Sequence, residues 1–252
     1  MPTYKLTMEY DGAAYAGWQR QPNQETIQAK LESALQELTQ EMISTVAAGR
    51  TDAGVHAQGQ VVSFRSDRPL SQADWTRGLN AVLPPDIGIR STEPVSPEFH
   101  ARYSAVGKVY EYRIVNDRRR PVLDRTRVWH VPKKLDLEAM REAVPYLLGR
   151  QNCLSFQGSP TDNTNPICEI RCLEIHEADS KIHIRIEADR FLKQMVRTIV
   201  GTLVEVGLHR RKPADFKVIL ASQDRRAAGK TAPAHGLCLI EVLYPKSVNR
   251  KP

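Results

Sequence analysis

The sequence predicts an α+β fold of two related halves, in which helices back a largely antiparallel central sheet. Some segments alternate apolar and polar residues, as half-buried strands do, whereas others repeat apolar residues at helical spacing. The order strand, helix, strand, strand, helix opens the chain, and a similar order returns after residue 105. We therefore expect an N-terminal half over residues 1–104 and a C-terminal half over residues 105–252.

The first half contains three predicted strands and two predicted helices. Thr26 stands where the first helix needs an N-cap, and Pro84-Pro85 stops the second helix, because proline lacks the N–H that a helix interior uses. A loop that begins at Gly49-Arg50 separates the second and third strands. The predicted strands cover residues 4–10, 44–48 and 59–64, and the predicted helices cover residues 27–38 and 71–83.

The second half repeats this mixture of strands and helices. Pro145 falls inside the first of its predicted helices, where we expect a kink in the last turn. Residues 158–166 are rich in Ser, Thr, Asn and Pro and predict an exposed loop. The predicted strands cover residues 108–115, 167–176, 182–188 and 237–243, and the predicted helices cover residues 135–148 and 194–208.

Four cysteines in 252 residues do not make a disulfide framework. Cys168 and Cys172 lie four residues apart in a predicted strand, where they would share a face but stand about 13 Å apart. One metal ion cannot bind both, so we expect ordinary packed thiols. No Cys-x-x-Cys or His-x-x-x-His spacing occurs, and we therefore predict no structural zinc.

The sequence also argues against a membrane or secreted protein. Its best apolar stretch, Thr198–Val204, is bounded by Arg197 and Glu205 and falls far short of the roughly 18 residues of a membrane span. The opening residues do not place a basic region before an apolar one, as a secretory signal does. We expect a cytoplasmic protein without a membrane partner.

Charge is distributed unevenly between the halves. Residues 1–104 carry 9 Lys and Arg against 12 Asp and Glu, a net charge of −3, whereas residues 105–252 carry 27 against 17, a net charge of +10. A polyanion bound mainly by the second half would explain this asymmetry, and several basic clusters there favour nucleic acid. The clusters are Arg118–Arg120, Arg125 with Arg127, His209–Lys212 and Arg225-Arg226.

The loop between the second and third strands carries the first candidate for catalysis, Asp52. Arg50 precedes it by two residues and can keep its carboxylate ionised, while Gly49 and Gly54 let the backbone approach a ligand closely. His56 adds a donor or base. The alternative is a simple turn, in which Asp52 bonds its own backbone ahead of Gly54.

Two further candidates lie in the basic half. Tyr110 and Tyr112 alternate on a strand and so share a face, where a ring could stack on a base or form an aromatic pair in the core. Arg197 sits inside an apolar helix, where a buried guanidinium needs a carboxylate. Its candidate partners are Glu187, Asp189, Glu205 and a catalytic Asp from the first half.

These residues belong to a series of motifs that resembles the tRNA pseudouridine synthase A family. The blocks occur in order over nearly the whole chain, and Gln194 and Thr198 are small departures, at positions where the family pattern has His and Asn. The matching blocks are Tyr10-Asp11-Gly12, Gly17–Gln21, Arg50–Ala57, Gly59-Gln60-Val61, Phe99–Arg102, Lys108 with Tyr110 and Tyr112, Phe191-Leu192, Met195–Arg197, Ile199-Val200-Gly201 and Gly236-Leu237.

The resemblance implies the pseudouridine synthase fold and an isomerase that needs no cofactor. It implies conversion of uridine to pseudouridine at positions 38, 39 and 40 of the tRNA anticodon stem-loop. It also implies a homodimer whose two subunits together form the RNA cleft.

The resemblance also implies roles for individual residues. Asp52 is the expected nucleophile, attacking either C1′ of the ribose or C6 of the base, and Arg197 pairs with it. Tyr110 is expected to stack on the uracil and is placed to take the C5 proton. The target must leave the base stack, and Arg50 would fill its space or hold the flipped nucleotide. Leu237 and Leu239 are expected to form an apolar floor under the base.

Two other functions compete with this interpretation. A tRNA-binding protein or RNA chaperone without chemistry would account for the charge and the aromatic residues. A metal-independent ribonuclease would use His56, His100 or His209 as acid and base. A nuclease shortens its substrate, whereas an isomerase leaves its length and mass unchanged.

Overall fold

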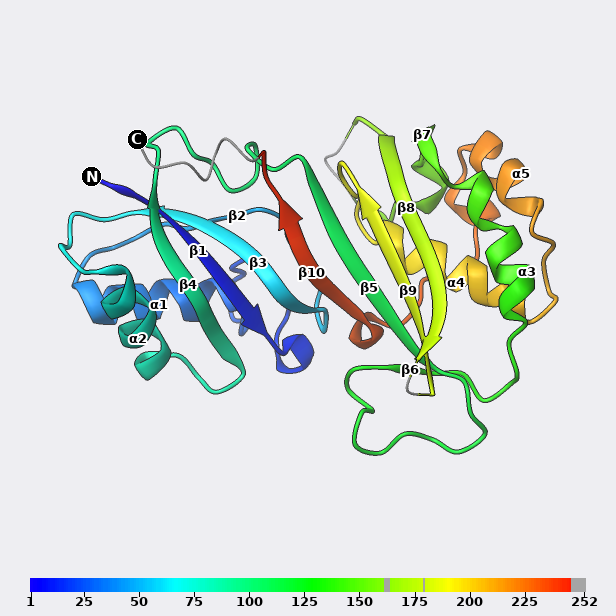
Figure 1. Cartoon of the computed structure of the whole chain (residues 1–252), viewed down its shortest axis with the longest axis horizontal. Coiled ribbons are helices and arrows are strands. Elements are labelled where there is room, and N and C mark those ends of the chain that lie inside the picture. Colours follow the sequence, from blue (N-terminus) through cyan, green and yellow to red (C-terminus); the bar gives the residue numbers. More distant parts are fainter. Residues whose placement is uncertain (161–163, 179, 246–252) are drawn as a thin grey trace. The chain divides into compact units, whose positions relative to one another are not determined.

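A computed structural model describes residues 1–160, 164–178 and 180–245, which form two compact units (Figure 1). Unit 1 contains Met1–Val106 and the segment that begins at Cys238, and unit 2 contains Gly107–Leu237. The first boundary lies two residues beyond the one expected at 104. The division also differs from the expected halves at the end of the chain, because the closing strand belongs to unit 1 and not to the second half. Residues 246–252 lie outside the described residues.

The sheet of unit 1 has the strand order β4-β1-β3-β10. The strands β3 and β4 run antiparallel to β1, and β10 runs parallel to β3. Two helices lie behind this sheet in Figure 1. The elements are β1 (Thr3–Tyr10), α1 (Ile27–Thr39), β2 (Val46–Ala47), β3 (His56–Arg65), α2 (Gln72–Val82), β4 (Ile87–Val95) and β10 (Leu237–Leu243).

Aromatic side chains fill the core between this sheet and its helices. Tyr4 and Phe64 are paired across β1 and β3, and their ring centroids are 5.3 Å apart. Trp75 of α2 lies 5.2 Å from Tyr4 and 5.3 Å from Phe64 and is fully buried. The predicted N-cap of α1 is confirmed, since Thr26 accepts a hydrogen bond from the Ala29 backbone.

The sheet of unit 2 has the order β5-β9-β8-β7 and is antiparallel throughout, with β6 added in parallel beside β5. The predicted α+β class with a largely antiparallel sheet is confirmed. The elements are β5 (Gly107–Val115), β6 (Trp129–His130), α3 (Leu137–Glu142), β7 (Gly149–Asn152), β8 (Ile167–Ala178), β9 (Lys181–Ala188), α4 (Met195–Gly207) and α5 (Asp215–Ser222).

The helix predicted over residues 135–148 is shorter than expected. Regular α-helix covers only Leu137–Glu142, and Val144–Tyr146 forms a separate 3₁₀ turn. Pro145 explains the break, because its ring excludes a helical hydrogen bond and disfavours helical backbone at the residue before it. Of the loop expected over residues 158–166, residues 161–163 lie outside the described residues.

A β-bulge corrects the prediction that Cys168 and Cys172 share a face. The pairing of β8 with β9 shifts between Ile170 and Cys172, so the alternation reverses at that point. Cys168 is fully buried and Cys172 is half-buried. Four strands and helices were not predicted at all, namely β4, β6, β7 and α5.

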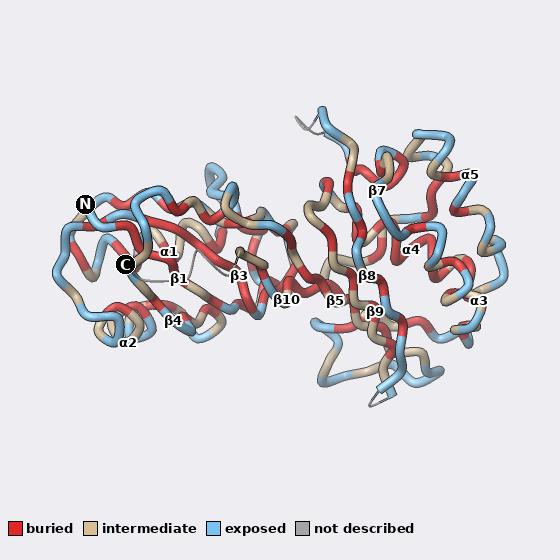
Figure 2. Tube along the Cα trace, turned by 45° about the horizontal axis from the view of Figure 1, so that its top comes forward, coloured by how far each residue is buried: buried red, intermediate tan, exposed pale blue. Residues whose placement is uncertain are grey.

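No helix within the described ranges is long and apolar enough to span a membrane. The most apolar helix, α4, is instead enclosed by protein, and Figure 2 shows it as buried along nearly its whole length. Apolarity on all sides of a helix is typical of a position inside a domain.

Gly201 allows the segment around Lys230 to lie directly on α4. A Cβ atom at Gly201 would lie 1.8 Å from the Lys230 carbonyl oxygen and 3.3 Å from the Ala232 nitrogen. Backbone atoms cannot yield as a flexible side chain can. This contact therefore sets the distance between α4 and the chain that precedes β10.

We predict that Gly201→Ala lowers the free energy of unfolding by about 2 kcal/mol, because the clash outweighs the roughly 1 kcal/mol that alanine adds to helix propensity. Urea denaturation measures the change. Gly88→Ala is the control, since its Cβ would meet only the Glu9 side chain, at 3.6 Å. Equal urea midpoints for Gly201→Ala and the unaltered protein would contradict the prediction.

Candidate active site

Asp52 lies in the loop that leads into β3, in unit 1. Its side chain is half-buried, whereas Thr51 before it is buried and Arg50 is exposed. The Val55 N–H donates to the Asp52 carbonyl oxygen over 3.1 Å, and Gly54 has a φ of +78°. The loop therefore contains the turn that was raised as the alternative, and Gly54 supplies the left-handed residue that this turn needs.

Two glycines bring the chain after β1 against this loop. A Cβ atom at Gly12 would lie 2.0 Å from the Val55 carbonyl oxygen, and one at Gly17 would lie 2.7 Å from the Thr51 carbonyl oxygen. Gly17 also has a φ of +98°. The Trp18 N–H donates to the Thr51 carbonyl oxygen over 3.0 Å. The loop is thus held by backbone contacts on both sides of Asp52.

A buried polar network fixes the same loop from the side of the sheet. The Tyr10 hydroxyl lies 2.9 Å from the Thr51 hydroxyl, and Gln60 donates from Nε2 to the Gly49 carbonyl oxygen over 2.8 Å and to the Tyr10 hydroxyl over 3.4 Å. Burial raises the pKa of Tyr10 to about 12, and the hydrogen bonds to Thr51 and Gln60 oppose that rise. Tyr10 and Gln60 lie in two of the family motifs, but local sequence does not reveal that they support the loop.

His56 supports the turn after β1. Its Nδ1 atom lies 3.1 Å from the Gly12 nitrogen and 3.1 Å from an Asp11 carboxylate oxygen. His100 likewise accepts backbone hydrogen bonds from Arg102 and Tyr103, each over 3.2 Å. These two histidines of the ribonuclease alternative are therefore engaged in local structure.

The third candidate acid or base, His209, has an exposed side chain. Its Nε2 lies 3.4 Å from a carboxylate oxygen of Asp136. No part of the described chain brings three or more His, Cys, Asp or Glu side chains together in a way that could hold a metal ion.

Both tyrosines of β5 are buried in unit 2, on one face of the strand. Tyr110 is 7 % exposed, and its ring meets Phe191 edge-on with centroids 5.1 Å apart. Tyr112 is fully buried and donates to the Pro233 carbonyl oxygen over 2.7 Å. Its ring also meets Trp129 edge-on at 6.2 Å. Of the two roles considered, Tyr112 thus takes that of a core aromatic residue.

Arg197 lies in the first turn of α4 and is tied to the chain before β10. Its Nε–H donates to the Ala232 carbonyl oxygen over 2.8 Å, and the Ala232 N–H donates to the Arg197 carbonyl oxygen over 3.0 Å. Burial raises the pKa of Tyr112, and the positive charge of Arg197 lowers it. The charge of Arg197 therefore lies close enough to Tyr112 of β5 to affect the ionisation of its hydroxyl.

The local carboxylates proposed as partners of Arg197 have other partners. Glu205 pairs with Arg211 at 2.6 Å. Asp189 accepts backbone hydrogen bonds from residues 169 and 190, over 2.8 and 2.7 Å. Glu187 lies 3.9 Å from Arg171.

The remaining predicted residues divide between the units. Arg50, Asp52 and Leu239 belong to unit 1, whereas Leu237 is the last residue of unit 2, with Tyr110 and Arg197. Leu237 is 6 % exposed and Leu239 is fully buried, as apolar supports should be.

The two departures from the family pattern lie at the start of α4. Gln194 has a left-handed backbone with a φ of +59°. Thr198 is buried, and its Oγ1 has no hydrogen-bond partner in the described part of the chain.

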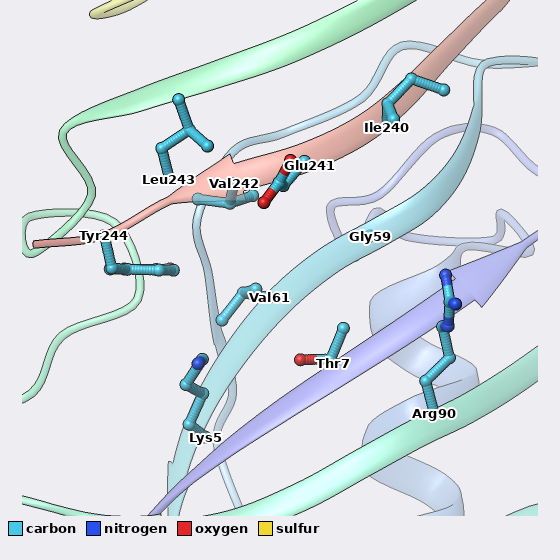
Figure 3. Close-up of a pocket in the computed structure, with 10 residues that line it drawn as sticks. All are labelled: Lys5, Thr7, Gly59, Val61, Arg90, Ile240, Glu241, Val242, Leu243 and Tyr244. Carbon is cyan, nitrogen blue, oxygen red and sulfur yellow. The ribbon is translucent and has the colours of Figure 1, made fainter. Parts of the chain in front are cut away.

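A separate hollow of about 430 Å³ lies on the sheet of unit 1 (Figure 3). Lys5 enters its wall, paired with Glu93 at 2.9 Å, and Arg90 donates to the Gln58 carbonyl oxygen over 3.0 Å. None of the predicted catalytic residues lines this hollow. The lining residues are Lys5, Thr7, Gly59, Val61, Arg90, Ile240, Glu241, Val242, Leu243 and Tyr244.

Comparison with known proteins gives consistent matches. The profile of a family described as tRNA pseudouridine synthase matches residues 6–104 and 143–245. A tRNA pseudouridine synthase A of Myxococcus xanthus is 45 % identical over 97 % of this chain and 92 % of its own length. A tRNA pseudouridine synthase A 2 of Clostridium perfringens is 42 % identical over 97 % of this chain and 100 % of its own length. A tRNA pseudouridine synthase A of Moorella thermoacetica is 45 % identical, also over 97 % of this chain and 100 % of its own length.

These matches cover nearly the whole chain and include the loop that holds Asp52 and the helix that carries Arg197. The family suggested by the sequence motifs is confirmed. The chain belongs to the tRNA pseudouridine synthase family.

Proposed function

We propose that this protein isomerises uridine to pseudouridine in tRNA, at positions 38, 39 and 40 of the anticodon stem-loop, without a cofactor. The main support is Asp52, a half-buried carboxylate on a loop that glycine contacts and a buried hydrogen-bond network hold in place. Family membership supports the reaction class. We further propose a cytoplasmic homodimer, which the family resemblance implies.

The reaction requires one bond to break and another to form on the same uracil. The C1′–N1 bond breaks, the base turns, C5 bonds to C1′, the C5 hydrogen leaves as a proton, and N1 takes up a proton. No electrons are gained or lost overall. An ionised carboxylate therefore serves as nucleophile, and Asp52 would attack C1′ or C6 and be released when the new nucleoside forms.

Arg197 and Tyr110 would assist this carboxylate. A guanidinium near Asp52 favours its ionised form and orients it. The hydrogen bond from the Arg197 Nε–H to the Ala232 carbonyl oxygen keeps that guanidinium in a defined position in unit 2. Tyr110 would stack on the uracil and take the C5 proton, and its contact with Phe191 fixes the plane of its ring.

A uridine inside a stem must leave the stack before a side chain can reach it. Arg50 is exposed and long enough to take the vacated space or hold the flipped nucleotide. Leu237 and Leu239 would support the base from below. Binding without chemistry remains the second candidate function, since the basic second half explains RNA affinity by itself.

We predict that Asp52→Asn abolishes isomerisation, with a loss of at least about 1,000-fold, because an amide is not a nucleophile of this kind. Tritium release from tRNA labelled at C5 of uridine measures each turnover. Affinity for tRNA should stay within about threefold, since the amide has the size of the carboxylate and every basic side chain that could bind phosphate is kept. Asp67→Asn, at an exposed carboxylate 3.1 Å from the N-terminal amine, is the control. Substantial release by pure Asp52→Asn would remove Asp52 as nucleophile.

Tyr110→Phe separates stacking from proton transfer. Phenylalanine keeps the ring and its contact with Phe191 but has no hydroxyl to accept a proton. We expect kcat to fall by about 100-fold while tRNA binding is retained. An unchanged kcat in the tritium assay would leave Tyr110 a stacking role only.

Arg197→Met should reduce both stability and rate. It removes the charge and the hydrogen bond to Ala232 while keeping an unbranched apolar chain in the helix. We expect a loss of about 1–3 kcal/mol in urea denaturation and at least a 100-fold loss in kcat. Arg171→Met, on the surface of β8, is the control. Wild-type stability and rate in Arg197→Met would disprove the proposed ion pair.

A further inference from the structure

The segment between β5 and β6 is the part of unit 2 that the proposed chemistry does not use. It leaves the sheet after Val115 and returns at Trp129, and Figure 1 shows it as a loop extending beyond the strands around β6. It lies within residues 105–142, which the family profile does not match. Residues 116–128 contain five Arg against two Asp, a net charge of +3 in a chain whose total is +7.

Both ends of this loop are fixed. The side chain of Asn116 donates to the carbonyl oxygens of Val131 and Lys133, each over 2.7 Å, and accepts from the Leu135 N–H over 2.9 Å. The parallel pairing of β5 with β6 places His130 beside Val115. A single amide thus closes the loop with three hydrogen bonds.

Contacts inside the loop give it a defined shape. Lys181 of β9 pairs with Asp124 at 2.7 Å, which ties the loop to the sheet. The Arg125 guanidinium donates to the Val122 carbonyl oxygen over 3.1 Å, a bond that uses one of its five N–H groups. His130 donates from Nε2 to the Asp117 carbonyl oxygen over 2.8 Å. The charged side chains are therefore presented on an ordered frame.

The loop and His235, on the segment before β10, border an open pocket of about 500 Å³. One part of its lining is apolar, and the other consists of arginine and histidine side chains. Arg120 forms no ion pair with any residue that the structure describes, and Figure 2 shows the loop around it as largely exposed. The pocket is lined by Arg120, Pro121, Val122, Arg125, Val128, His130 and His235.

The chemistry of this lining matches a nucleotide unit of RNA. Guanidinium groups bind phosphate through paired N–H donors, whereas the apolar wall suits a ribose or the face of a base. The volume lies within the roughly 300–1,000 Å³ of small-ligand pockets. An acidic peptide would match the arginines but would not account for an apolar wall of this kind beside them.

The position of the pocket relates it to the proposed catalytic strand within unit 2. Val115, which β6 pairs with His130, lies five residues along β5 from Tyr110, or about 16 Å at the usual rise of a strand. Stacked nucleotides advance about 3.4 Å each along a helix axis, so this span covers several nucleotides. We propose that the pocket binds a phosphate-ribose unit of the tRNA several nucleotides from the target uridine. This inference rests on the proposed function.

The first test removes the two arginines together. Equilibrium binding of a fluorescently labelled tRNA transcript is measured between about 50 and 200 mM KCl for Arg120→Ala/Arg125→Ala. We expect at least a tenfold rise in Kd at the lower salt concentration and a salt slope smaller by about one, because the pocket binds one phosphate. The rate of tritium release at saturating enzyme should stay within twofold. Arg77→Ala is the control, because Arg77 is comparably exposed but lies on α2.

The second test distinguishes a pocket from a charged surface. Val122→Ser keeps every charge but removes part of the apolar wall, so Kd should rise about threefold with the salt slope unchanged. Val218→Ser, at a similarly exposed valine of α5, is the control. Both arms together support the proposal.

Unchanged affinity and slope in the arginine variant would overturn the proposal, as would a fall in the saturating rate at constant Kd. A reduced slope without any effect of Val122→Ser would also overturn it, leaving only a charged surface. Tritium release by the unaltered protein is scored separately. Release together with unchanged binding in the variants refutes the pocket alone, whereas no release together with the expected binding changes refutes the proposed function and keeps an RNA site.

Discussion

The candidate site depends on the close approach of two backbone segments in unit 1, the loop around Asp52 and the chain from Gly12 to Trp18. Atoms of Val55 and Thr51 occupy the positions that Cβ atoms at Gly12 and Gly17 would need. This approach also allows the backbone hydrogen bond from Trp18 to Thr51. A catalytic carboxylate must be held within a fraction of an ångström to be effective, and backbone contacts achieve this better than mobile side chains do.

The polar groups near Asp52 serve the same purpose. Tyr10, Thr51 and Gln60 form a buried network that continues to the Gly49 carbonyl oxygen, so both ends of the loop are fixed to the sheet. Satisfied networks of this kind favour one geometry, because each alternative leaves a buried polar group without a partner. His56 plays a comparable part beneath Gly12. These motif residues therefore hold the loop of Asp52 and the adjoining turn in place.

Unit 2 organises its charged residues differently. Arg197 is held by Ala232, and Gly201 sets the approach of that segment to the helix. The loop between β5 and β6 instead presents its arginines outward on a frame closed by Asn116. Unit 1 thus contains a rigidly supported carboxylate, and unit 2 contains a half-buried arginine and a basic surface suited to a polyanion.

Periodicity and motifs in the sequence were sufficient for the α+β class, most helices and strands, the family and the candidate residue Asp52, because these depend on local pattern and residue type. Tertiary contacts decided the rest. The return of β10 to unit 1, the bulge that turns Cys172 away from the face of Cys168, and the core position of Tyr112 each depend on residues distant in the chain. Local pattern cannot specify which strand a segment pairs with or which carbonyl a buried hydroxyl meets, since both are set by the packing of the whole unit.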